Sequence, residues 1–104
     1  MSKVESIITK YSDFCAICGR PRECWHHGMS GTANRKVSDS LGAVWPLCED
    51  CHTGASSSIH RNHRLDKMCK IATELAVEKH FVASGMSEAE AREEFRRLFG
   101  KNCI

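Results

Sequence analysis

The stretches Cys15-Ala16-Ile17-Cys18 and Cys48-Glu49-Asp50-Cys51 decide the fold of this 104-residue chain. Each is a C-x-x-C pair, and 29 residues separate the two pairs. A two-residue spacer lets both thiolates of one turn reach the same ion about 2.3 Å away, and zinc takes four such ligands as a tetrahedron. The spacing therefore predicts one structural zinc held by all four cysteines.

The composition favours metal ligation over disulfide bonds. Seven cysteines are an odd number and no signal-peptide pattern precedes them, so we expect a reducing, cytoplasmic compartment. The first sixty residues hold few large aliphatic side chains, whereas zinc contributes about 10 to 16 kcal/mol to the folding of zinc-finger peptides. If the cysteines formed a redox motif or were plain buried thiols, the presence of a second C-x-x-C pair would be a coincidence. An iron–sulfur cluster also uses four thiolates, but the spacing here is not that of a ferredoxin.

The basic residues around these pairs predict contact with phosphate groups. The net charge is only +2, but Lys and Arg gather in and just after the cysteine-rich half, while glutamates gather toward the C-terminus. Such residues bind nucleic acid by neutralising phosphates, and the candidates are Arg20, Arg35, Lys36, Arg61 and Arg64. A solvated face is the alternative interpretation. No apolar run approaches the roughly 18 residues of a membrane span, so no membrane partner is expected.

Local patterns predict mainly helices outside the pairs. Apolar residues at spacings of three and four predict an N-terminal helix over residues 2–12. We expect a tight turn over residues 14–22, a loop with a short strand over residues 24–44, and an extended segment over residues 43–47 before a helical turn. Helices are predicted from Leu65 to Gly85 and from Ser87, where Glu90 completes a capping box, to Gly100.

Together these elements predict one small α+β domain spanning residues 1–104. A zinc module would occupy residues 13–62, and a helical hairpin over residues 64–100 would pack on it and supply apolar cover. Cys69 and the two tryptophans are expected in the core, while Cys24 and Cys103 have no predicted role.

Four histidines near the pairs predict a second metal site. Zinc ribbons commonly place 15 to 20 residues between their pairs, so the spacer here leaves room for an insertion, and it carries His26 and His27. His52 directly follows Cys51, and His60 lies shortly after it. Four thiolates already complete a zinc site, so these histidines would serve another, open site suited to chemistry. The alternative is that they face solvent, or that His52 packs beside the zinc.

The order of these motifs resembles the HNH (ββα-metal) endonuclease family, particularly its small phage-type members. C-x-x-C-G, H-H-x-x-x-G-x-x-N-R, W-P-L-C-x-x-C-H and I-H follow one another over residues 15–62. The resemblance implies a treble-clef fold, His26 as ligand of a catalytic divalent ion and His27 as general base. It also implies a ligand from the helical region after the second pair, for which both His52 and His60 are candidates. The implied ion is Mg²⁺, Mn²⁺, Ni²⁺ or Zn²⁺.

The chain departs from that family at one position. An Asn normally lies a few residues before the second pair, where Gly42-Ala43 stands here, and Asn34 or Asn62 would have to replace it. The implied reaction is phosphodiester hydrolysis, with DNA expected as substrate ahead of RNA. Two further interpretations stay open: a non-catalytic zinc module that binds DNA or a protein partner, and a purely structural domain.

Overall fold

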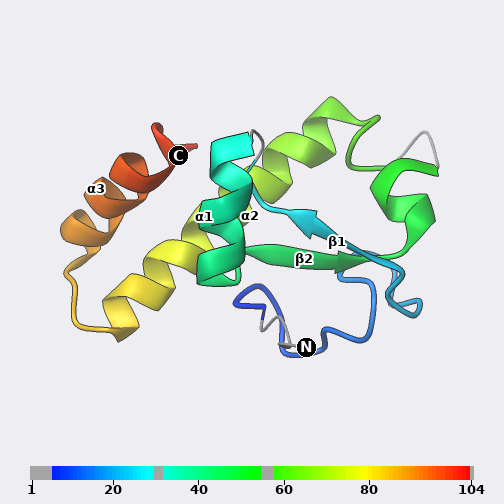
Figure 1. Ribbon diagram of the computed structural model, residues 1–104, viewed down its shortest axis with the longest axis horizontal. Coiled ribbons are helices and arrows are strands. Elements are labelled where there is room, and N and C mark those ends of the chain that lie inside the picture. The colour runs from blue at the N-terminus through cyan, green and yellow to red at the C-terminus, as the bar shows by residue number, and fades with distance from the viewer. Residues whose placement is uncertain (1–5, 30–31, 55–57, 104) are drawn as a thin grey trace.

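The chain folds into three helices around a two-stranded sheet within the part that the computed structural model describes, residues 6–29, 32–54 and 58–103. The order of elements along the chain is β1 (Cys24–His27), α1 (Thr32–Leu41), β2 (Val44–Leu47), the π-helical turn η1 (Asp50–Gly54), α2 (His63–Ala83) and α3 (Glu88–Phe99). This arrangement, drawn in Figure 1, confirms the predicted α+β class.

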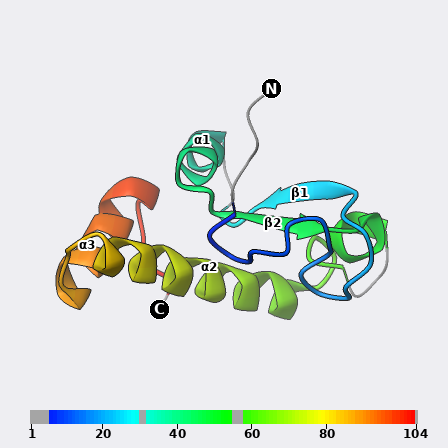
Figure 2. The same cartoon turned by 90° about the horizontal axis from the view of Figure 1, so that it is seen from below.

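The sheet is antiparallel and lies between two helices. Cys24 is paired with Leu47 at one end of the sheet, and His27 is paired with Val44 at the other. Figure 2 shows α2 running along one side of the sheet and α1, which connects the two strands, on the opposite side. The Trp45 indole N–H donates to the Thr73 hydroxyl (2.9 Å) and ties the sheet to the middle of α2.

Two apolar clusters divide the core. The smaller one surrounds the cysteine pairs and includes Leu47, Ile59, Leu65, Cys69 and Trp45. The larger one joins α1, the second half of α2 and α3 through Met29, Val77, Phe81, Phe95 and Phe99. The cysteine region is thus covered by the first half of α2, whereas α3 packs against the other cluster. The expectation that the whole hairpin covers the cysteine region is met only by α2.

The predicted N-terminal helix is wrong over residues 6–12, where the chain forms bends and turns; residues 2–5 lie outside the described residues. The Ser6 hydroxyl accepts hydrogen bonds from the backbone N–H groups of Ile8 and Thr9, and it donates to the Val44 carbonyl (2.7 Å). The Ile7 N–H donates to the Gly42 carbonyl (2.9 Å). These bonds take the backbone groups that a helix would use, a known competition for serine and threonine.

The segment expected to be a loop with a short strand contains the strand β1 but also the helix α1. Val37 and Leu41, four residues apart, place this helix against the larger cluster. Gly42 follows with φ +77°, a left-handed conformation that suits glycine and ends the helix. Ala33, Val37 and Leu41 recur at a spacing of four in this sequence, which is compatible with a helix. A helix of ten residues is marginal by itself, so tertiary packing stabilises this element.

The structure confirms the two predicted C-terminal helices and their signals. Ser87 and Glu90 form the reciprocal capping box, and Gly100 ends α3 with a left-handed backbone. Asn62 caps α2 by accepting from the Leu65 N–H (3.0 Å). Among the described residues, no helix combines the length and apolar character that a membrane crossing requires.

Gly28 marks a close approach between the end of β1 and α2. A methyl group at this position would lie 2.4 Å from the Thr73 Cγ2 atom and 3.0 Å from the Ala43 carbonyl oxygen. Neither atom can yield easily, because Thr73 is buried and bonded to Trp45. We expect Gly28→Ala to lower the free energy of unfolding by about 1–3 kcal/mol, the usual cost of overpacking. Urea denaturation followed by tryptophan fluorescence measures this, and an unchanged midpoint would contradict the packing described.

Candidate metal centre

Two tight turns present the four paired cysteines. In the first, the Cys15 N–H donates to the Arg20 carbonyl (2.6 Å), and Gly19 takes the left-handed backbone that closes the turn. The second pair lies at the end of β2 and in η1, where the His52 N–H donates to the Cys48 carbonyl (3.0 Å). Each turn therefore points both of its thiols in one direction, as the C-x-x-C spacing predicts.

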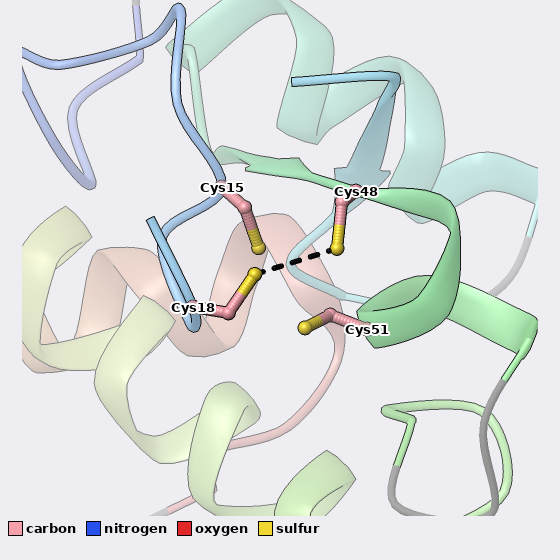
Figure 3. Close-up of side chains that lie close together, drawn as sticks. All are labelled: Cys15, Cys18, Cys48 and Cys51. Carbon is pink, nitrogen blue, oxygen red and sulfur yellow. Dashed lines mark hydrogen bonds between the residues drawn. The ribbon is translucent and has the colours of Figure 1, made fainter. Parts of the chain in front are cut away.

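The four sulfur atoms converge on one point, as Figure 3 shows. All lie within 4.8 Å of one another, and the Sγ atoms of Cys18 and Cys48 are 3.5 Å apart. In a tetrahedron with bonds of about 2.3 Å, neighbouring sulfurs are separated by about 3.8 Å. The four cysteines are therefore positioned to hold a metal ion, which confirms that part of the prediction.

The thiols in this cluster do not ionise independently. Burial alone would raise the pKa of the Cys15 thiol, but hydrogen bonds from the backbone at Cys18, Cys48 and Ile17 lower it to about 6. Burial and the neighbouring thiols of Cys48, Cys18 and Cys15 instead raise the pKa of Cys51. Several thiolates in so small a volume require a cation to offset their mutual repulsion.

We expect the chain to retain about one equivalent of tightly bound metal, and Cys48→Ser to lose it and to unfold at lower urea concentration. Elemental analysis after mild chelation gives the stoichiometry. Cys69→Ser is the matched control, because Cys69 is buried in the same apolar cluster but lies outside the sulfur group. Metal retained by Cys48→Ser at the wild-type level would contradict this assignment.

Three histidines from separate segments form a second cluster. His26 lies on β1, His52 in η1, and His60 in the turn before α2. Their potential ligand atoms lie within 4.8 Å of one another, and the Nε2 atoms of His52 and His60 are 3.0 Å apart. The sequence left His52 and His60 as alternatives, but the structure brings both to His26.

The environment keeps this cluster in the form that binds metals. His26 is only 8% exposed, and burial, followed by the charges of His60 and His52, lowers its pKa to about 4. Burial and His60 also lower the pKa of His52. Both imidazoles are therefore neutral at pH 7, and a neutral imidazole offers the lone pair that a metal ion needs.

A pocket of about 300 Å³ opens beside this cluster. It is lined by His26, His27, Gly28, Ile59, His60, Arg61, His63, Asp66 and Lys70. His27 thus shares one pocket with two members of the histidine cluster. Its Nε2 atom lies 2.9 Å from an Asp39 carboxylate oxygen, and the Lys70 ammonium pairs with Asp66 at 3.0 Å.

Among the other predicted residues, all of which the structure describes, Arg61 alone lines this pocket. Neither candidate asparagine lines the pocket: Asn62 caps α2, and Asn34 lies half-buried on α1. Arg20 pairs with Asp50 at 2.9 Å. The remaining predicted phosphate contacts, which are exposed on α1 and α2, are Arg35, Lys36 and Arg64.

Sequence reasoning missed Asp39 and the three pocket residues contributed by α2. His63, Asp66 and Lys70 follow one another at spacings of three and four, so they share one helix face, and this periodicity was available in the sequence. Asp39 had no comparable signal, because its contact with His27 depends on how α1 is packed.

Cys24, which had no predicted role, belongs to a third group. Its Sγ atom, a Glu49 carboxylate oxygen and a His52 ring nitrogen lie within 4.8 Å of one another. The Cys24 thiol also donates to the Leu47 carbonyl (3.4 Å), and burial followed by the charge of Glu49 raises its pKa. Cys24 thus directs its thiol hydrogen to a backbone carbonyl and is not one of the four cysteines whose sulfur atoms converge.

Comparison with known protein families, characterised proteins and solved structures finds no match to this chain.

The histidine cluster predicts a second divalent-ion site that can be titrated separately from the sulfur site. With the sulfur site filled, Co²⁺ or Ni²⁺ should bind at one further site. Binding should weaken at least about tenfold in each of the variants His26→Ala, His52→Ala and His60→Ala, because losing a residue that merely orients a metal ligand already costs that much affinity. Calorimetry measures the affinity. His80→Ala is the control, because His80 is exposed on α2 outside the cluster. Equal affinity in all four variants would exclude the site.

Proposed function

We propose that this protein is a metal-dependent endonuclease of the HNH type, which hydrolyses phosphodiester bonds in nucleic acid and prefers DNA. One observation carries the proposal: three histidines lie at metal-ligand separation, and two of them, His26 and His60, share the walls of a single pocket with His27. Neutral imidazoles with a further histidine at their side are the groups that metal-assisted hydrolysis uses.

The sulfur cluster would hold a structural zinc ion and give the cysteine region a treble-clef fold. Four thiolates leave no open position on a tetrahedral ion, so this site would have no part in the chemistry. Its contribution would be to fix the end of β1 that carries His26 relative to η1, which carries His52. A zinc ion also fits the close approach of the four sulfurs, of which two are buried, because thiolates packed together need positive charge near them.

The second ion would be held by His26, His52 and His60. When bound, it would supply positive charge to the scissile phosphate and the leaving 3′ oxygen. Three protein ligands leave positions open for substrate, in contrast to the sulfur site. Mg²⁺, Mn²⁺, Ni²⁺ and Zn²⁺ are all candidates, and the nitrogen donors favour the last three.

His27 would be the general base that takes a proton from the attacking water. Imidazole accepts a proton near neutral pH, and His27 lines the pocket beside the ligand set while standing outside it. Adjacent residues of a strand point to opposite sides, so His26 can bind the ion while His27 serves another purpose.

Basic groups on the pocket walls and around it would contact the phosphate backbone. Arg61, His63 and Lys70 line the pocket, and the further candidates, which do not line it, are Arg20, Arg35, Lys36 and Arg64. Each such contact releases counterions, so binding should weaken as salt is raised.

Plasmid nicking with each of the four metal ions, and with EDTA, tests the proposal. His27→Ala should keep metal and nucleic-acid binding but lose cleavage by about two to four orders of magnitude, the usual contribution of a positioned base. His26→Ala should instead lose metal affinity, and excess Mn²⁺ should restore part of its activity. His80→Ala should cleave like the wild type.

A wild-type chain that cleaves neither DNA nor RNA with any of these ions would overturn the proposal. In that case salt-dependent binding of nucleic acid without cleavage would identify a non-catalytic zinc module instead. Wild-type cleavage by His27→Ala would remove that residue from the mechanism and leave the metal site to be tested by His26→Ala.

A further inference from the structure

Asp39, on helix α1, contacts the imidazole ring of His27, the proposed general base. The Nε2 atom of His27 and an Oδ1 atom of Asp39 lie 2.9 Å apart, and the two residues are 12 positions apart in the sequence. The side chain of His27 is 31% exposed and that of Asp39 is 62% exposed. An exposed pair of this kind adds little to stability, so its value would lie in orientation.

The backbones that carry the two residues are fastened together. Directly after His27, the Gly28 N–H donates to the Ala43 carbonyl (2.9 Å), and the Ala43 N–H donates to the Ser38 carbonyl (2.8 Å). The Gly42 N–H donates to the carbonyl of Asp39 itself (3.3 Å). Val37 and Leu41 pack α1 against the larger cluster, so the helix backbone that carries Asp39 is held in place.

This contact selects one tautomer of His27. An ionised carboxylate only accepts hydrogen bonds, so the His27 nitrogen that faces it must carry the proton. With Nε2–H donating to Asp39, the lone pair of the neutral ring lies on Nδ1. Because the hydrogen bond at Nε2 holds the ring of His27 in one orientation, the lone pair on Nδ1 points in a defined direction.

We propose that Asp39 is a positioning residue: it holds His27 as the Nε2–H tautomer and leaves Nδ1 to accept the proton from water. The inference rests on the proposed nuclease function. A positioning role for Asp39 would also explain the length of the spacer between the cysteine pairs, because α1 lies within that spacer and places Asp39 near the end of β1.

Cleavage kinetics of the zinc-loaded full chain provide the first test. Asp39→Ala should lower kcat by about 10- to 100-fold, as does the loss of a carboxylate that orients a metal-binding histidine, while KM and metal content stay at the wild-type values. Asp39→Glu, which keeps the carboxylate, should recover part of the loss. In the His27→Ala background Asp39→Ala should cost nothing further, since a positioning residue has no effect without its partner.

Two control variants separate this role from general effects. Asp13→Ala removes an exposed acidic side chain elsewhere on the surface, and Ser40→Ala changes the next exposed position of α1. Both should cleave like the wild type. A matching loss in Ser40→Ala, or an additive loss when Asp39→Ala is combined with His27→Ala, would overturn the positioning role.

Nitrogen-15 NMR of the histidine rings reads the tautomer without any cleavage. Wild-type His27 should show Nε2 as the protonated nitrogen, and Asp39→Ala should show a mixture of tautomers. An Nδ1–H ring in the wild type would overturn the inference, as would a cleaving wild type matched in kcat by Asp39→Ala. A wild type that cleaves nothing would instead overturn the proposed function and the catalytic part of this inference with it, and the NMR result would still decide the contact.

Discussion

Four thiols from two turns, with Cys18 and Cys48 thirty residues apart in the sequence, meet in a volume where all sulfurs lie within 4.8 Å. Cys15 and Cys48 also belong to the smaller apolar cluster, so the sulfur cluster is part of the core that holds this end of the molecule. The two strands beside it are four residues long each, too short to be stable as an isolated hairpin. A cation among the sulfurs would remove the repulsion between thiolates and hold both turns at the end of the sheet, so the folding of this end would depend on that cation.

The same convergence sets the positions of the histidines. His52 follows Cys51 directly, and His26 is two residues from Cys24, which is paired with Leu47 beside Cys48. His60 is brought in by backbone bonds, because the Ile59 N–H donates to the Cys51 carbonyl (2.8 Å) and the His60 N–H donates to the His52 carbonyl (3.3 Å). The sulfur cluster and the histidine cluster thus share the short backbone segment that contains Cys51 and His52, so a change at the first cluster is expected to move the second.

The surroundings favour a charged side chain in the sulfur cluster and neutral side chains in the histidine cluster. In the sulfur cluster, backbone N–H groups favour at least one thiolate, which lowers the pKa of Cys15. In the histidine cluster, burial opposes the imidazolium form of His26 and keeps its lone pair free. His27 belongs to neither cluster, and its Nε2 atom contacts the Asp39 carboxylate instead of a further potential ligand.

The sequence by itself determined the features that depend on residues close together in the chain. The two C-x-x-C turns, the capping box of Ser87 and Glu90, and the left-handed end at Gly100 follow from local geometry that any surrounding fold would keep. Only the tertiary structure decided the rest. The hydroxyl of Ser6 binds a strand carbonyl and prevents the expected helix over residues 6–12, and α1 forms because its few apolar side chains reach a core built by α2 and α3. His52 and His60 both join His26, and Asp39 meets His27, through contacts between segments 8 to 34 positions apart, which leave no periodic trace in the sequence.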